Sequence, residues 1–222
     1  MNFDTSKDFV LENERALLRP LQPNDLTHLL PFALNEPEIW NYSLTPGDGE
    51  ANMKHYLGVA LDKRAIGDSY PFLVFDKKAN TYAGSTRFYD IQPVHNTVQL
   101  GYTWYGANFQ GTGLNKNCKF LLLQFAFETL KVERVEFRAD AENARSIAAM
   151  KSIGCTEEGI LRSNCAAVNG RRNSIVLSIL KDEWFTTVKE ALQKKNIIHA
   201  ERTTKKLPSD IGIRLSKAPT VF

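Results

Sequence analysis

The stretch that decides the fold is Gln110-Gly111-Thr112-Gly113-Leu114-Asn115, a short loop that contains two glycines. The residues before it, 97–105 (TVQLGYTWY), are rich in β-branched and aromatic side chains and predict a strand. The residues after it, 114–130, are apolar with helical spacing. A glycine loop between a strand and a helix leaves backbone N–H groups free at the positive end of the helix dipole. This arrangement binds phosphate without a charged side chain, so the loop predicts a phosphate-bearing ligand.

The two common nucleotide-binding loops each fail on one residue. The dinucleotide fingerprint requires a third glycine, and the stretch Gly111-Thr112-Gly113-Leu114-Asn115-Lys116 ends in lysine instead. The P-loop requires Lys followed by Ser or Thr directly after its last glycine. Gly106 and Gly111 have the P-loop separation, but Thr112 stands where that lysine belongs. The loop therefore indicates a different phosphate ligand.

A second helix follows about thirty residues later, within the stretch 140–154. Asn143 is a predicted N-cap and Gly154 a predicted terminator of this helix. Residues 134–138 alternate like a strand before it, and 158–162 read as extended chain after it. Asn169-Gly170 is a hairpin signal, and the apolar run 174–180 predicts a buried strand.

These short motifs, in this order, resemble the GNAT superfamily of N-acetyltransferases. The acyl-CoA loop of that family reads Gln/Arg-x-x-Gly-x-Gly/Ala. Here Gln110 and Gly113 match it, and Asn115 departs from its Gly/Ala. The resemblance is to the branch typified by ribosomal-protein N-terminal (alanine/serine) acetyltransferases, and it spans residues 97–184. The further motifs of that branch are present as Asn143…Ser146, Gly154, Glu158-Gly159…Arg162, Asn169-Gly170 and Glu183-Trp184.

The predicted order of elements is β-α-α-β-β-β-α-β-α-β-β with a trailing helix at 182–194. It begins with a strand at 15–21, a helix from Pro23, and a second helix at 50–65. This order indicates an α/β fold, and the resemblance implies one GNAT-like domain with a mixed, mostly antiparallel sheet flanked by helices. We expect this domain to cover residues 1–195, followed by a basic C-terminal extension at 196–222.

Composition is typical of an enzyme domain of the cytoplasm. The chain has 222 residues and is 43% apolar, without a run of the roughly 18 apolar residues that a membrane span needs. The cysteines Cys118, Cys155 and Cys165 lack metal-ligand spacing and fit free thiols in a reducing compartment, so we expect a cytoplasmic protein without a metal. Cys118 falls on an apolar helix face and is predicted to lie in the core.

Charge is concentrated at the C-terminal end of the chain. Residues 181–222 hold 9 Lys and Arg against 5 Asp and Glu, which leaves 19 against 20 for the rest of the chain. A near-neutral body with a basic tail argues against a dedicated nucleic-acid binder. The tail is predicted to be a solvated extension, with a docking arm for RNA or ribosomes as the alternative.

Acyl transfer to an amine requires donors aimed at the carbonyl oxygen and a proton source for the leaving sulfur. The resemblance implies acetyl-CoA as cosubstrate, with backbone N–H groups near Trp104 and Tyr105 serving the carbonyl and the pantetheine arm. It implies that Ser146 is the acid or positions the leaving thiol, and that Asn143 caps its helix and contacts cofactor or substrate. The residues implied to hold the pyrophosphate are Gln110, Gly111, Thr112, Gly113, Leu114 and Asn115.

The sequence does not identify the general base. Many GNAT enzymes have glutamate on the central strand where this chain has Gln99, so either water or another carboxylate takes the proton. Glu36, Glu38 and Asp48 are candidates. The predicted activity is N-acetylation of a primary amine, with protein α-amino groups, polyamines and small amines left open as acceptors and a homodimer left open as the assembly. The alternative is a non-catalytic CoA sensor or interaction module, which Gln99 and the departure at residue 115 suggest.

Overall fold

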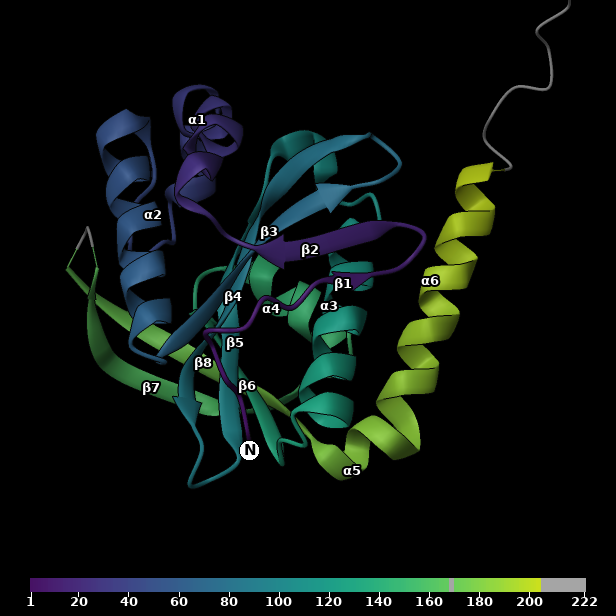
Figure 1. Cartoon of the computed structure of the whole chain (residues 1–222). Coiled ribbons are helices and arrows are strands. Elements are labelled where there is room, and N and C mark those ends of the chain that lie inside the picture. The colour runs from purple at the N-terminus through teal and green to yellow at the C-terminus, as the bar shows by residue number, and fades with distance from the viewer. Residues whose placement is uncertain (168–169, 205–222) are drawn as a thin grey trace, which may run out of the picture.

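The structure is a computed structural model that describes residues 1–167 and 170–204. One eight-stranded sheet, in the order β1-β2-β3-β4-β5-β6-β8-β7, forms the centre of the molecule. Figure 1 shows α1 and α2 on one side of this sheet and α3 and α6 on the other. The α/β fold with a mixed, mostly antiparallel sheet is therefore confirmed, since only β5 and β6 run parallel.

The N-terminal half of the chain supplies the first five strands. Its elements are β1 (Leu11–Glu12), β2 (Ala16–Pro20), α1 (Leu26–Asn35), α2 (Gly49–Ala65), β3 (Ser69–Asp76), β4 (Thr81–Gln92) and β5 (Thr97–Tyr105). The predicted opening strand and both helices are confirmed. A single 3₁₀ turn, Pro23–Asp25, precedes α1, because the Asp25 carboxylate accepts from the Gln22 N–H at 2.7 Å and pairs with Arg19 at 2.6 Å. The short strand β1 was not predicted from the sequence.

The C-terminal half alternates helices with the remaining strands. Its elements are α3 (Leu114–Gln124), a π-helical turn (Phe125–Thr129), β6 (Arg134–Asp140), α4 (Ala144–Ser152), β7 (Thr156–Ala167), β8 (Gly170–Leu180), α5 (Lys181–Glu183), a second π-helical turn (Trp184–Val188) and α6 (Lys189–Thr204). The trailing helix is longer than predicted and continues through residue 195 to Thr204. The rest of the predicted basic extension, 205–222, and the hairpin residue Asn169 lie outside the described residues.

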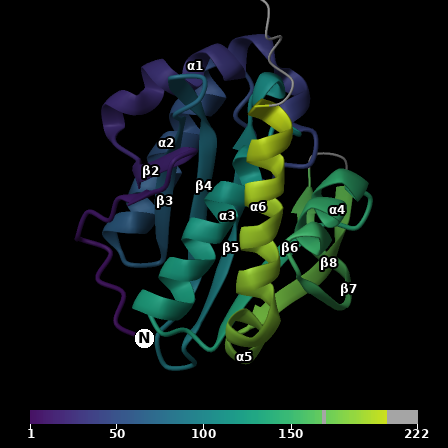
Figure 2. The ribbon, with the colours of Figure 1, turned by 90° about the vertical axis from the view of Figure 1, so that its right-hand side faces the viewer.

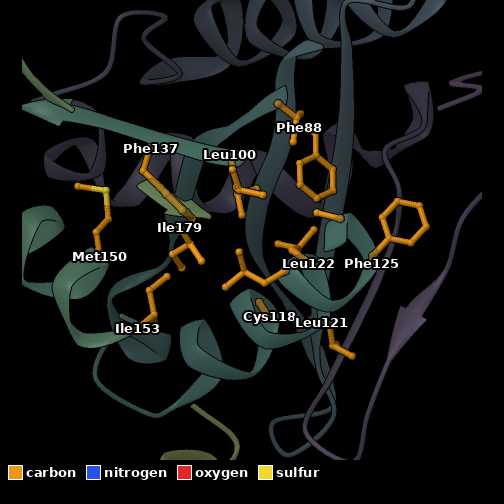
Figure 3. Close-up of a cluster of buried hydrophobic side chains, with 14 of the residues drawn as sticks. Phe88, Leu100, Cys118, Leu121, Leu122, Phe125, Phe137, Met150, Ile153 and Ile179 are labelled. Carbon is orange, nitrogen blue, oxygen red and sulfur yellow. The ribbon is translucent and has the colours of Figure 1, made fainter. Parts of the chain in front are cut away.

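Alternation along the strands buries both faces of the sheet. In β3, Tyr70 and Phe72 point into the core beneath α3, whereas Leu73 points to the smaller core beneath α1 and α2. Figure 2 shows α3 and α6 lying together across the first face. Figure 3 shows the core under α3, where Leu122 and Cys118 face the strands. Cys118 is fully buried, which confirms its predicted core position.

Two neighbouring strands separate in the middle of the sheet. β5 and β6 pair only where Thr97–Gln99 lies opposite Arg134–Glu136. Beyond Gln99, the remainder of β5 has no ladder partner on its β6 side, so backbone groups along 100–105 are left to face a gap. No helix of the described residues is long and apolar enough to cross a membrane.

Candidate active site

A cavity of about 960 Å³ opens where β5 and β6 separate. Its wall is built from β5, the glycine loop, the first turn of α4 and the ends of β6 and β8, and it continues to the segment 38–44 that precedes α2. The predicted site residues Trp104, Tyr105, Gln110, Gly111, Asn115, Asn143 and Ser146 all line this cavity. Segments that are far apart in the sequence are thus brought together as one site.

The glycine loop has the backbone conformation that a helix N-terminal anion site needs. Gly111 and Gly113 have φ of 72° and 85°, a left-handed conformation that glycine adopts without strain. Gly113 is the N-cap of α3, and the first intrahelical bond runs from the Asn117 N–H to its carbonyl. The N–H groups of the preceding first turn therefore have no carbonyl partner within the helix.

Three of the predicted loop residues do not line the cavity with their side chains. The Leu114 side chain is fully buried in the core and anchors the start of α3. The Thr112 hydroxyl donates to the Phe109 carbonyl at 2.7 Å. Gly113 and these two residues can therefore contribute to ligand binding only through the backbone, whereas Asn115 lines the cavity and has a buried Oδ1 without a hydrogen-bond partner among the described residues.

Gln110 connects the loop to its neighbours. Its amide Nε2 donates to the Tyr105 carbonyl at 2.8 Å, and its Oε1 accepts from Arg145 Nη1 at 2.5 Å. The end of β5, the loop and the start of α4 are therefore joined through one side chain. Arg145 adds an exposed cation beside the loop. Sequence reasoning missed Arg145, because its role depends on α4 lying next to the loop.

The first turn of α4 has the predicted cap. Asn143 Oδ1 accepts from the Ser146 N–H at 3.0 Å. The helix ends as predicted at Gly154, whose φ of 100° is left-handed. Ser146 is half-buried and lines the cavity together with Asn143.

Trp104 and Tyr105 point to opposite faces of the sheet. Trp104 Nε1 donates to the Tyr56 hydroxyl of α2 at 3.2 Å, which fixes the ring on the α2 side. Tyr105 packs on the α3 side against Cys118. Burial raises the pKa of the Cys118 thiol to about 12, so this cysteine stays protonated and is not a nucleophile.

The candidate bases are dispersed, and a residue that the sequence did not single out lies among them. Gln99 Nε2 donates to Asp90 Oδ2 at 2.6 Å, and both side chains line the cavity. Glu38 lines it too. Neither Glu36 nor Asp48 does: Glu36 accepts from the Ala107 N–H at 2.6 Å, and Asp48 accepts from Asn52 at 3.2 Å. Asp90 was missed because it lies 9 residues before Gln99, and only the pairing of β4 with β5 joins them.

A buried lysine also lines the cavity. Lys119 of α3 is 5% exposed, and its Nζ donates to Thr103 Oγ1 at 2.8 Å. Burial lowers the pKa of Lys119 to about 8. This residue was missed as well, because a lysine in an otherwise apolar helix reads from sequence as surface charge.

A family model described as an acetyltransferase (GNAT) domain matches residues 15–156. The chain belongs to the GNAT acetyltransferase family. It is an N-acetyltransferase that uses acetyl-CoA, and the alternative of a non-catalytic module is not favoured. Among the residues the structure describes, no group of three or more His, Cys, Asp or Glu side chains could hold a metal.

Relatives and solved structures agree with this assignment. The chain is similar to the putative ribosomal N-acetyltransferase YdaF of Bacillus subtilis (strain 168), at 26% identity over 178 residues, covering 78% of this chain and 94% of YdaF. A GCN5-related N-acetyltransferase from Brucella melitensis shares the fold with a TM-score of 0.79 at 24% identity, covering 86% of each chain. RimJ of Mycobacterium smegmatis, solved in complex with CoA-disulfide, shares it with a TM-score of 0.70 at 16% identity, covering 85% of this chain and 93% of RimJ.

Proposed function

We propose that this GNAT enzyme transfers the acetyl group of acetyl-CoA to an α-amino group or a small primary amine within the cavity described above. The observation that carries the proposal is that one cavity extends from the glycine loop, past the unpaired edge of β5, to the α2 side of the sheet. Such a passage gives two substrates access to the same point from opposite sides.

The residues of the cavity fit acetyl-CoA. The first turn of α3 offers N–H groups for a pyrophosphate, and Arg145 adds a cation beside them. The free backbone edge of β5 offers donors to an amide-containing arm and to a carbonyl oxygen. We therefore propose cofactor binding by Gln110 to Asn115, by the backbone near Trp104 and Tyr105, and by Asn143.

Acetyl-CoA supplies a thioester whose carbonyl carbon accepts the amine. A C–N bond forms, the C–S bond breaks, the amine loses a proton and the sulfur gains one. We propose that Asp90, directly or through a water molecule, takes the amine proton, and that the Ser146 hydroxyl donates to the departing sulfur. Gln99 then positions the Asp90 carboxylate through its hydrogen bond. In this way Gln99, which stands where many GNAT enzymes have a glutamate, supports the base and does not act as one.

The charges of the cavity disfavour a polycationic acceptor. Its wall contains four acidic side chains (Glu38, Asp90, Asp140 and Glu142) and four basic ones (Lys119, Arg138, Arg145 and Arg172). A polyamine site would require a clear excess of acidic groups. Similarity to YdaF, a putative ribosomal N-acetyltransferase, supports a ribosomal acceptor as one class.

Thiol release from acetyl-CoA, measured with a panel of peptides and small amines, tests the proposal. We expect amine-dependent release by the wild-type protein and at least a tenfold lower kcat in Asp90→Asn. Asparagine is isosteric and tolerates the φ of 47° at this position, so the fold should be preserved. Absence of thiol release with every amine would refute acetyl transfer to these classes, and an unchanged kcat in Asp90→Asn would exclude Asp90 as the base.

A further inference from the structure

Two arginines, one in the wall of the cavity and one behind it, are buried without a carboxylate partner among the described residues. Arg87 of β4 is 3% exposed and Arg172 of β8 is 9% exposed. Neither forms an ion pair with any residue in the described part of the chain. Other shielded arginines do have such partners, as in the pairs Arg15–Asp76, Arg19–Asp25 and Arg138–Glu136.

Arg172 lies in the cavity wall in a fixed orientation. Its Nε donates to Ser174 Oγ at 2.9 Å, and Ser174 is itself buried and lines the same cavity. The two terminal nitrogens of the guanidinium have no hydrogen-bond partner among the described residues. The fork of donors that arginine uses to bind oxyanions is therefore free on the cavity side.

Arg87 lies directly behind the same wall. Its guanidinium carbon is 4.1 Å from the centroid of the Tyr102 ring and 4.8 Å from that of Tyr56, and both tyrosines line the cavity. Its Nε and Nη2 are enclosed and make no hydrogen bond. The two ring faces stabilise the cation in part but do not neutralise its charge.

The two arginines flank one cluster of tyrosines. The Tyr89 and Tyr102 rings are in edge-on contact at 5.0 Å, and Tyr89 also lines the cavity. Burial raises the pKa of Tyr89, while the nearby Arg138 and Arg172 cations oppose that rise. Arg87 on Tyr102 and Arg172 near Tyr89 thus give this part of the cavity two cations, neither of which is paired with a carboxylate among the described residues.

A buried charge without a partner is unfavourable, and buried polar groups in proteins are normally paired. The missing counter-charge is explained if the substrate supplies it. Resting on the proposed acetyl transfer to an amine, we propose that the acceptor amine carries an oxyanionic group, a carboxylate or a phosphate, which Arg172 binds and which the charge of Arg87 attracts. Asp90 in the same cavity then faces the amine end, so the wall complements a molecule with a cation at one end and an anion at the other.

Matched acceptors test this inference with the full chain and acetyl-CoA. The acceptors are glutamate, isoglutamine and glutamine, peptides that begin with Glu or Gln, 2-aminoethyl phosphate with ethanolamine as its neutral partner, and spermidine. We expect kcat/KM for an acceptor that carries the recognised anionic group to exceed that of its partner lacking this group by at least tenfold. Isoglutamine against glutamine shows whether the α-carboxylate or the side-chain carboxylate is recognised, and aminoethyl phosphate tests the phosphate.

The arginine variants connect the preference to the residues. Arg172→Gln should bring the anionic-to-neutral ratio close to one, Arg172→Lys should restore part of it, and Arg87→Gln should lower it several-fold. Arg171→Gln is the matched control, because Arg171 is the next residue on β8, is exposed, and donates to Ser163 outside the cavity. Its ratio should equal that of the wild type.

The outcomes separate this inference from the proposed function. If neutral amines or spermidine react as well as the anionic acceptors, or if Arg172→Gln keeps the preference, the inference is wrong and acetyl transfer stands. If no amine releases thiol, the proposed function fails. Calorimetric titration of glutamate and its amides into the wild type and Arg172→Gln then tests the inference without turnover. Tighter binding of glutamate than of at least one amide by the wild type, lost in Arg172→Gln, supports the inference. Equal binding of all three ligands by the wild type overturns it.

Discussion

Ser146 lies in the first turn of α4, where its backbone and its side chain serve different purposes. The backbone N–H donates to Asn143 Oδ1, and the residue lines the cavity, where the hydroxyl is proposed to act. A change from serine to alanine removes only the hydroxyl and keeps the hydrogen bond that caps the helix. The position therefore allows the proposed acid role to be tested without disturbing the helix.

Ser146→Ala should lower kcat at least tenfold, because a hydroxyl that donates to the developing charge on sulfur assists its departure. The apparent KM for acetyl-CoA should stay within a few-fold, since the pyrophosphate is proposed to bind the glycine loop. Steady-state thiol release measures both. Ser152→Ala is the control on the same helix, because Ser152 does not line the cavity and its hydroxyl donates to the Ala149 carbonyl at 2.8 Å. A normal kcat in Ser146→Ala would assign the acid role to water.

Lys119 makes the stability of the enzyme depend on pH. Burial lowers the pKa of Lys119 from 10.5 to about 8 in the folded state, so the unfolded state binds the extra proton between these two pH values. Stability contributed by this group should therefore rise as pH increases from about 8 to 10.5, and the cost of burying the charge is fully present below about pH 8.

Lys119→Met should therefore be more stable than the wild type at neutral pH, and the difference should shrink between about pH 8 and 10.5. Denaturant unfolding of both proteins across this range measures the effect. Burial raises the pKa of Cys118 and Cys155 to about 12, and the Lys119 charge opposes that rise, so the comparison is read most directly between about pH 8 and 9, below the ordinary pKa of these thiols. A difference that does not change with pH would show that Lys119 is uncharged or solvated in the folded protein.

The sequence predicts those parts of the site whose contacts join residues close together in the chain. The cap by Asn143 and the glycine loop between a strand and a helix depend on neighbouring residues, and both were predicted. Asp90 beside Gln99 and the donor-rich Arg172 depend on strand pairing across the sheet, which a pattern within one segment does not encode. Local motifs therefore predicted the residues proposed to bind the cofactor, while the residues proposed to face the acceptor became apparent only from the tertiary structure.

At the scale of elements, the approach of β4 to β5 depends on Gly84. Its φ is 155°, and a Cβ at this position would lie 2.1 Å from the Trp104 carbonyl oxygen and 2.9 Å from the Tyr105 Cα. The backbones of the two strands can approach this closely only because the side chain is absent. Trp104 and Tyr105 are cavity-lining residues, so the spacing of these strands also sets the position of the site.

Gly84→Ala should lower the free energy of unfolding by about 1–3 kcal/mol, because the strands must separate to admit the methyl group. It should also reduce turnover by displacing the end of β5. Thermal unfolding and thiol release measure the two effects. Gly58→Ala in α2 is the control: no atom lies within 4 Å of the added Cβ, and alanine favours the helix, so this variant should be as stable as the wild type or more so. Equal stability of the two variants would contradict this account.

Elements were predicted where the periodicity of the sequence matches the structure. The helices at 26–35 and 49–65 and the strands flanking the glycine loop follow the expected pattern. The helical region from Lys181 to Thr204 is longer than predicted. The prediction ended too early because few apolar residues follow residue 192 to mark the helix in the sequence. Among the side chains described between Lys181 and Ile197, only Trp184, Val188 and Leu192 are buried, so the apolar pattern that marks a helix is weak here.

At the scale of the whole molecule, α6 holds the two helices of the cofactor side together. Figure 2 shows α6 lying along α3, and Leu192 is 1% exposed within the core under α3. On its other side, Lys195 Nζ donates to the Ser152 carbonyl at the end of α4 at 2.8 Å. Since α3 starts at the glycine loop and α4 carries Ser146, α6 stabilises the relative placement of both.

Two truncations separate α6 from the residues that follow it. A chain that ends at Thr204 keeps the whole sheet, the cavity and α6, so its unfolding temperature and its turnover with a small amine should match those of the full chain. A chain that ends at Val188 loses Leu192 and the bond from Lys195 to α4, and burial of one leucine side chain alone contributes roughly 2 kcal/mol. It should unfold at a clearly lower temperature and lose turnover, as thermal scans and thiol release would show. Loss of turnover in the chain that ends at Thr204 would instead make residues 205–222 part of the catalytic domain, against the prediction of a basic extension outside it.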